Sequence, residues 1–242
     1  MYSEEWKQKL AELPEVSYQE AMDCLHGGRV VKEARVPFLN LNRLSFSHEI
    51  VFENCQMVGL VARGTLFKEK VFFRNCLFIE RLEMSAHKEK EEFEKTVLEK
   101  GMEIRDSLFQ ETLMLRNAEV GGDFSLLRCR VDNLLSFDRA IFQGNVLLLG
   151  PGQIATCSFY QAQLSHHLNI QDCTFSGTPE KSLDLNKVQI AGILTLSGCH
   201  FQQGIEAKRA RLGTGNPKSM VMENCTFEDR KSTRLNSSHV SQ

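Results

Sequence analysis

A short pattern of apolar residues restarts along most of this chain and restricts the folds that are open to it. Between Leu194 and Leu212 the pattern occurs twice. Each copy has two apolar residues two positions apart, then a small residue followed two positions later by another apolar residue. Residues two apart lie on one face of an extended segment. A chain that points inward twice, turns and points inward twice again winds around an axis, so the pattern predicts a solenoid of short strands.

The same unit can be followed along most of the sequence. Most units restart after 10 or 11 residues, with longer steps after Leu82, Leu168 and Ile205. Repetition at a fixed period is typical of repeat architectures. A sandwich of antiparallel strands is the alternative, but its hairpins favour turns such as Asn-Gly or Asp-Gly, which this sequence lacks. The units start at Leu39, Ile50, Leu60, Val71, Leu82, Met102, Leu113, Phe124, Leu135, Val146, Cys157, Leu168, Leu183, Leu194, Ile205 and Met220.

The small residue of each unit indicates how many units make one turn. Cysteine takes this position only in even-numbered units and alanine only in odd-numbered ones. Two units therefore make one turn of about 22 residues, and about eight turns stack like residues in ladders. The even positions are Cys55, Cys76, Ser107, Cys129, Pro151, Cys173, Cys199 and Cys225. The odd positions are Leu44, Thr65, His87, Ala118, Ala140, Ala162, Val188 and Ala210. We expect a bulge where Gly150, Pro151 and Gly152 interrupt one unit.

These paired inward positions resemble those of pentapeptide-repeat proteins, in which a small residue is followed two positions later by leucine or phenylalanine. The opening GGRVVKEARVPFLNLNRL is also similar to the entry of degenerate bacterial members. The resemblance covers residues 29–227 and implies an all-β protein, a right-handed quadrilateral parallel β-helix. The best matches are Ala118-x-Val120, Cys129-x-Val131, Ala140-x-Phe142, Ala162-x-Leu164, Cys173-x-Phe175, Cys199-x-Phe201, Ala210-x-Leu212 and Cys225-x-Phe227.

The first 38 residues predict a helical cap. One short helix is expected from Ser3 to Leu13, where Pro14 stops it. A second is expected from Ser17, whose capping box uses Glu20, to about Leu25. The apolar face of the second helix would cover the first turn, which would otherwise expose its strand edges.

The repeat domain is expected to span residues 39–228, with one charged insertion at 87–101. Phe93 and Val97 lie four residues apart in this insertion. A protruding helix of about three turns or a charged flap would both fit. A solvated excursion is favoured over a partner-binding arm.

Residues 229–242 carry no repeat periodicity. The stretch DRKSTRLNSSH resembles a translated sequencing-library adapter, so we exclude residues from Asp229 onward from the fold. We therefore expect the native C-terminus, and any membrane-spanning segment within it, to be missing.

The cysteines are expected to be buried packing residues. No Cys-x-x-Cys pair and no histidine at zinc-ligand spacing accompanies them, and buried cysteine behaves as a small hydrophobic residue. The sequence therefore predicts a structural ladder and no catalytic, cofactor or metal site. The ladder residues are Cys55, Cys76, Cys129, Cys173, Cys199, Cys225, Ala118, Ala140, Ala162, Ala210, Phe175, Phe201 and Phe227.

Charged side chains on the outside give the remaining candidate site. Lys208, Arg209 and Arg211 form a basic cluster that could contact a partner. The adjacent pair His166 and His167 is interpreted as surface turn residues. The outward acids are not expected to form a glycan-cleaving site, because the connections are too short to build a groove.

The sequence favours a non-enzymatic module that presents a rigid surface to an unknown protein partner. The net charge of −2 gives no basic balance for direct nucleic-acid binding. The charged N-terminus lacks a signal segment, so a cytoplasmic location is expected. Two alternatives stay open: the soluble part of a membrane-associated protein, contacting the membrane only through the missing C-terminal segment, or a DNA mimic that binds a topoisomerase. A homodimer is also possible.

Overall fold

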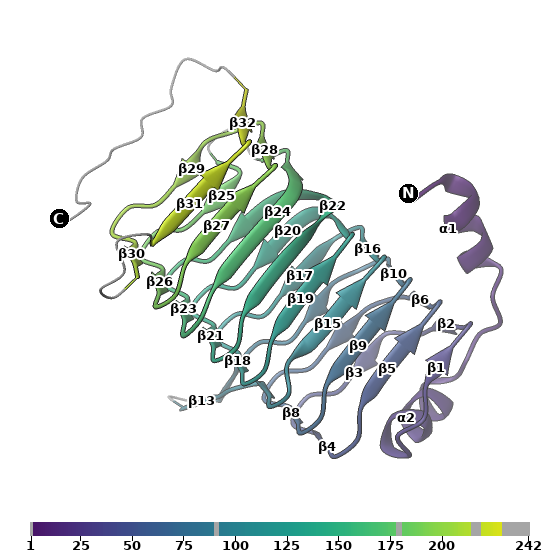
Figure 1. The fold of residues 1–242 in the computed structure, drawn as a ribbon. Helices are drawn as coiled ribbons and strands as arrows, with labels where there is room; N and C mark the ends of the chain where they lie inside the picture. Colours follow the sequence, from purple (N-terminus) through teal and green to yellow (C-terminus); the bar gives the residue numbers. More distant parts are fainter. Residues whose placement is uncertain (1, 90–91, 178–180, 214–218, 229–242) are drawn as a thin grey trace.

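The computed structural model describes residues 2–89, 92–177, 181–213 and 219–228, which form a parallel β-solenoid behind two short helices (Figure 1). Each complete turn contributes a stretch of strand to each of four ladders, and within a ladder the stretches of successive turns pair in parallel. The fourth ladder is a separate sheet of 8 strands, one for each turn. The predicted all-β solenoid of about eight turns is confirmed.

Two short helices precede the solenoid as the sequence predicts, and the second of them caps its first turn. They are α1 (Glu4–Ala11) and α2 (Tyr18–His26). The capping box between Ser17 and Glu20 is present in full at the start of α2. Ala21 and Leu25 of α2 are buried in the main core. The helix therefore covers apolar side chains of the first turn that would otherwise meet water.

Helix α1 lies against the outside of the solenoid. Leu10 is buried against Leu77 and Leu108, two outward-facing residues of the second ladder. The indole Nε1 of Trp6 donates a hydrogen bond of 2.9 Å to Asn75 Oδ1. A small cavity remains between Trp6 and the solenoid.

The first and second ladders form two sides of each turn. The first contains β1 (Val31–Lys32), β5 (Ile50–Glu53), β9 (Val71–Arg74), β15 (Met102–Arg105), β19 (Phe124–Leu127), the starts of β22 (Val146–Ser158) and β24 (Leu168–Phe175), β27 (Leu194–Ser197) and β31 (Met220–Glu223). The second contains β2 (Arg35–Val36), β6 (Gln56–Met57), β10 (Leu77–Phe78), β16 (Leu108–Phe109), the start of β20 (Arg130–Ser136), later parts of β22 and β24, β28 (His200–Phe201) and β32 (Thr226–Phe227).

The third and fourth ladders complete the turn. The third contains β3 (Leu39–Asn40), β7 (Leu60–Val61), β11 (Leu82–Glu83), β17 (Thr112–Met114), the ends of β20 and β22, β25 (Leu183–Asp184) and β29 (Ile205–Glu206). The fourth contains β4 (Ser45–Phe46), β8 (Leu66–Phe67), β14 (Val97–Leu98), β18 (Glu119–Val120), β21 (Ile141–Phe142), β23 (Gln163–Leu164), β26 (Gln189–Ile190) and β30 (Arg211–Leu212).

The core lies inside the four ladders and is built from stacked side chains. The rings of Phe175 and Phe201 stack at 5.0 Å between centroids, and those of Phe201 and Phe227 at 5.2 Å. Each such aromatic pair contributes about 0.5–1.5 kcal/mol beyond the apolar area it buries. Phe227, in the last described turn, remains 40% exposed. The inward positions predicted from the repeat are thus the positions that carry the packing energy.

The paired strands begin earlier than the predicted start of the repeat at residue 39. Strands β1 and β2 already pair with β5 and β6 of the next turn. Ala34 therefore lies one turn before Cys55 in the same ladder position, where it is buried. The sequence pattern does not identify this turn, because Ala34 occupies a position of the cysteine series and the alternation of cysteine and alanine begins only afterwards.

The charged insertion is a short antiparallel hairpin and not a helix. Its strands are β12 (His87–Glu89) and β13 (Glu92–Glu94), which project from the solenoid (Figure 1). The chain is back in the fourth ladder at Val97, so the small position of this turn belongs to buried Thr96 and not to His87. The Thr96 hydroxyl lies 2.6 Å from both Ala62 O and Ser85 O, which satisfies a buried corner.

The bulge expected near Gly150 is confirmed. The register between β22 and β24 shifts between Leu149 and Gly152. Gly152 then pairs with Cys173, so it replaces Pro151 as the small residue of this turn. A Cβ atom at Gly152 would lie 3.3 Å from Cys173 Sγ and from Cys129 O, so this position has little spare room.

Candidate interaction surface

The cysteines at the small position of the even-numbered units stack in one column, the cysteine ladder, at the corner where the chain passes from the first strand ladder to the second. Cys173, Cys199 and Cys225 occupy the same position in successive turns. Each sulfur lies 3.3–3.5 Å from the carbonyl oxygen two residues earlier, as in Cys173 Sγ to Gln171 O at 3.3 Å. Ser107 uses its hydroxyl in the same way, donating to Arg105 O at 2.8 Å. A small hydrogen-bond donor at this corner explains why serine can replace cysteine there.

The hydrogen bond with Cys76 lowers the pKa of Cys55, but burial keeps Cys129, Cys173 and Cys199 protonated. It raises the pKa of Cys129 to about 12 and the pKa of Cys199 to about 11, and it also raises the pKa of Cys173. Reactive and metal-bound cysteines are thiolates, whose pKa values are lowered. All eight cysteines are free, and the described residues contain no group of three or more metal-ligand side chains. The arrangement therefore suits packing rather than redox or metal chemistry.

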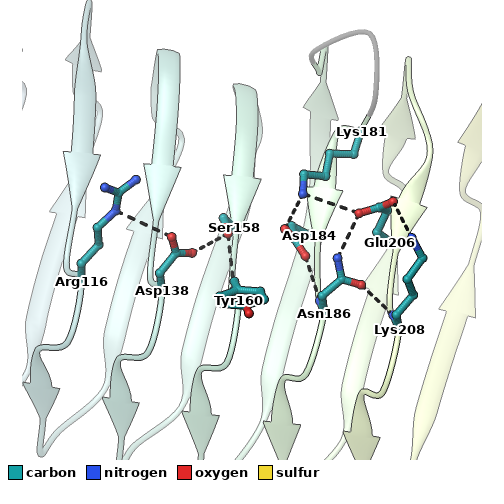
Figure 2. Close-up of polar contacts among 9 residues, drawn as sticks. All are labelled: Arg116, Asp138, Ser158, Tyr160, Lys181, Asp184, Asn186, Glu206 and Lys208. Carbon is teal, nitrogen blue, oxygen red and sulfur yellow. Dashed lines mark hydrogen bonds and ion pairs between the residues drawn. The ribbon is translucent and has the colours of Figure 1, made fainter.

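Polar side chains cover the outside of the third ladder and the turn that follows it (Figure 2). The Ser158 hydroxyl donates to Asp138 Oδ1 at 2.5 Å, and Arg116 Nε lies 3.7 Å from Asp138 Oδ2. Each contact joins neighbouring turns. Ser158 also accepts a hydrogen bond from the backbone N–H of Tyr160 at 3.4 Å. A polar residue in the strand thus fixes the chain as it leaves the third ladder.

A denser network continues over the last two turns of this side. Lys181 Nζ contacts Asp184 Oδ2 at 2.5 Å and Glu206 Oε2 at 3.5 Å, and Asn186 Nδ2 donates to Glu206 Oε2 at 2.9 Å (Figure 2). Burial opposes the charge on Lys181, but the two carboxylates outweigh it and raise its pKa. The hydrogen bond from Asn186, followed by Lys208 and Lys181, lowers the pKa of Glu206. Lys181 and Glu206 are therefore charged, and the contacts hold these side chains in fixed positions.

The structure separates the three predicted basic residues. Lys208 and Arg209 lie at the turn after the third ladder, which we call the third corner, whereas Arg211 lies in β30 of the fourth ladder. Lys208 remains 70% exposed although its ammonium group lies 3.4 Å from Glu206. Arg209 and Arg211 are also exposed. Lys208 therefore joins the network on the outside of the third ladder, which we call the third side. Arg209 lies beside it at the same corner, and Arg211 does not.

The sequence pattern did not single out Arg139, Tyr160 and Lys187, which the fold brings to the same corner. Lys187 Nζ donates to the Tyr160 hydroxyl at 3.0 Å and lies 5.2 Å from the centre of its ring. Arg139 Nε donates to Gln161 Oε1 at 3.0 Å. Arg139 lies three turns before Arg209, Tyr160 two turns and Lys187 one turn. Aligning the turns of the sequence by their period would therefore have placed these residues at one corner.

The histidine pair is a structural turn. The Nδ1 atom of His167 accepts a hydrogen bond from the backbone N–H of Ile193, one turn further along, at 3.0 Å. The backbone N–H of His167 donates to Asn145 Oδ1 at 3.4 Å.

Within the part of the chain that the structure describes, no helix combines the length and apolar character required to cross a membrane. The adapter-like residues from 229 onward lie outside the described residues.

Comparison with known proteins finds a structural likeness and no matching family. No protein-family model matches the chain, and no curated protein matches it. Among solved structures, the chain is similar to HetL, a pentapeptide repeat protein involved in heterocyst differentiation regulation from the cyanobacterium Nostoc sp. strain PCC 7120. The two are 13% identical with a TM-score of 0.29, over 82% of this chain and 95% of HetL. The parallel ladders of the chain itself, rather than this likeness, establish the solenoid.

Proposed function

We propose that this protein is a non-enzymatic β-solenoid of the pentapeptide-repeat type whose third side is a rigid binding surface for a protein partner. The observation that carries the proposal is the network from Arg116 to Lys208 on that side. Its side chains are tied to neighbouring turns by hydrogen bonds and ion pairs. A partner would therefore meet side chains that have already lost much of their conformational freedom, which lowers the entropic cost of binding.

The other predicted features fit this role. The cysteine and phenylalanine ladders fix the inside of the rod, so the outside of each turn is presented at a constant spacing of about 4.8 Å. The proposal places the protein in the bacterial cytoplasm, where its thiols would stay reduced. It assigns no catalytic residue and no cofactor.

The two alternatives have less support. A DNA mimic needs a run of negative charge, whereas the third corner carries Arg139, Lys187, Lys208 and Arg209. A membrane-associated protein would need a segment that is not among the described residues. The possibility of a homodimer is included in the test below, because a second copy would also count as a protein partner.

Photo-crosslinking in the cells that naturally express the chain would test the proposal. A crosslinking side chain would replace Arg116 on the third side or, as the matched control, exposed Gln143 after the fourth ladder. We expect a discrete protein adduct from position 116 and none from position 143. Equal labelling from both positions, or no protein adduct from either, would overturn the assignment of the third side.

A further inference from the structure

The non-glycine residues with left-handed backbone conformation differ in charge between two corners of the solenoid. All non-glycine residues of this kind among the described residues have φ between 50° and 60° and follow either the first or the third ladder. After the first ladder they are Glu33, Asn54, Asn75, Asp106, Arg128, Asp172 and Asn224. After the third ladder they are Arg43, Asn117, Arg139, Gln161, Lys187 and Arg209. At these left-handed positions the first corner is thus mixed with an acidic excess, while the third has basic and neutral residues. Asp138, which precedes Arg139 at the third corner, is acidic but already contacts Arg116 and Ser158.

From this asymmetry we infer that the third corner binds an acidic, extended segment of a partner protein through Arg139, Lys187 and Arg209. The inference rests on the proposed function and adds the chemistry of the partner. The protein as a whole has a net charge of −2, so a basic row on it is a local feature and not a consequence of composition. A local field of one sign steers an oppositely charged partner to that face.

The cations at the centre of this corner are held by neutral groups. Arg139 donates to the Gln161 amide oxygen, and Lys187 donates to the Tyr160 hydroxyl. By contrast, Arg63 makes a two-point ion pair with Glu83 at 2.7 and 2.9 Å. The structure gives Arg139, Lys187 and Arg209 no carboxylate partner among the described residues. Their charges are therefore positioned but not neutralised, which is the state that a carboxylate ligand would complete.

The backbone holds these residues in register. The N–H of Arg139 donates to Tyr160 O at 2.8 Å, that of Gln161 to Asn186 O at 3.0 Å, and that of Lys187 to Lys208 O at 2.8 Å. The corner residues are therefore spaced by one strand separation per turn. Arg139 and Lys187, two turns apart, are separated by about 9.6 Å along the rod. Alternate side chains of an extended peptide lie about 6.8 Å apart on one face, which long acidic and basic side chains can bridge.

A protein ligand fits this corner better than a nucleic acid. Binding of single strands relies on aromatic faces that are open to stacked bases. Here the aromatic residue is Tyr160, whose hydroxyl accepts a hydrogen bond of 3.0 Å from Lys187 Nζ, so the polar edge of its ring is already engaged. Tyrosine beside arginine is also the composition found at the energetic centres of protein interfaces.

Fluorescence anisotropy with a labelled synthetic peptide of alternating aspartate and serine tests the inference. The full chain should bind this peptide, and the double variant Arg139→Glu, Lys187→Glu should bind it at least about tenfold more weakly. Lys68→Glu makes the same kind of charge change at an exposed residue after the fourth ladder and should leave the affinity unchanged. A serine-only peptide should not bind, and an oligonucleotide of equal charge should compete poorly.

Gln161→Glu separates binding from folding. It would give Arg139 a carboxylate partner in place of the amide, so it should weaken peptide binding several-fold without lowering the thermal stability. The inference is overturned if both third-corner variants bind the peptide as the wild type does, or if the oligonucleotide binds more tightly than the peptide. If the double variant still forms the photo-crosslinked adduct from position 116, the third side binds a partner but acidic recognition at this corner is wrong.

Discussion

Replacing Cys129 should change how the stability of the protein depends on pH. Burial raises the pKa of this thiol from 9.0 to about 12 in the folded chain. Below pH 9 the thiol is protonated in both the folded and the unfolded chain, and its proton makes no pH-dependent contribution. Above pH 9 the unfolded chain loses this proton while the folded chain keeps it. Stability therefore falls as the pH rises from about 9 towards 12, because the folded state binds more protons than the unfolded state.

The size of the effect follows from the two pKa values. Each pH unit between them lowers the free energy of unfolding by about 1.4 kcal/mol. At pH 10 the wild type should therefore have lost about 1.4 kcal/mol through Cys129, relative to pH 7. Cys129→Ala cannot lose this proton. The stability difference between the wild type and Cys129→Ala should shrink by that amount between the two pH values, while the other titrating groups cancel.

Urea unfolding followed by circular dichroism at pH 7 and pH 10 measures this difference. Ser107→Ala is the matched control, because Ser107 has the same ladder position one turn earlier and its hydroxyl does not titrate in this range. Its stability difference from the wild type should be the same at both pH values. If the difference for Cys129→Ala is also the same at both, the thiol is not buried as the ladder requires and the reasoning is refuted.

Three further substitutions test the packing of the solenoid by thermal unfolding. Phe201→Ala should destabilise the protein by about 3–5 kcal/mol, and the partly exposed Phe227 serves as its control; equal losses at both would contradict the stacked core. Thr96→Val should cost about 1–3 kcal/mol because the one hydroxyl proton near the buried oxygens of Ala62 and Ser85 is lost, and an unchanged stability would contradict the burial of Thr96 at this corner. Gly101→Ala should cost more than about 1 kcal/mol, since φ is +84° and the new Cβ atom would lie 2.1 Å from Asp123 O; an unchanged melting temperature would refute this close approach.

Much of the inside of this fold could be predicted because every turn of the solenoid requires the same kinds of inward side chain at the same positions. The corner after the first ladder requires a small residue, and the structure shows that cysteine or serine there can also donate to a carbonyl oxygen. The alternation of cysteine and alanine in the sequence therefore indicates that two repeat units make one turn. The alternation does not identify the turn at Ala34, because there an alanine occupies a position of the cysteine series.

The insertion could not be placed from spacing alone. Both His87 and Thr96 are compatible with the count of residues, and the apolar pair Phe93 and Val97 suits a helix as well as a strand. The pairing of Val97 with Leu66 and Glu119 decides the conformation, because it returns the chain to the fourth ladder. The segment left between the two ends is then too short for a three-turn helix that starts and finishes at one corner.

The proposed binding surface is the hardest part to predict, because residues at outward positions are not selected by packing and so do not repeat in the sequence. Lys208 and Arg209 are adjacent in the sequence, which therefore shows them as a basic cluster. Arg139 and Lys187 become their neighbours only through the register of the turns. That register also explains how such a row can exist. Two unit charges at one strand spacing repel by about 0.9 kcal/mol in water, and at two spacings by about half of that. Gln161, between Arg139 and Lys187, provides the larger spacing and also an acceptor that holds Arg139. The neutral residue thus reduces the cost of the charged row in the absence of its ligand, and leaves the charge available to bind one.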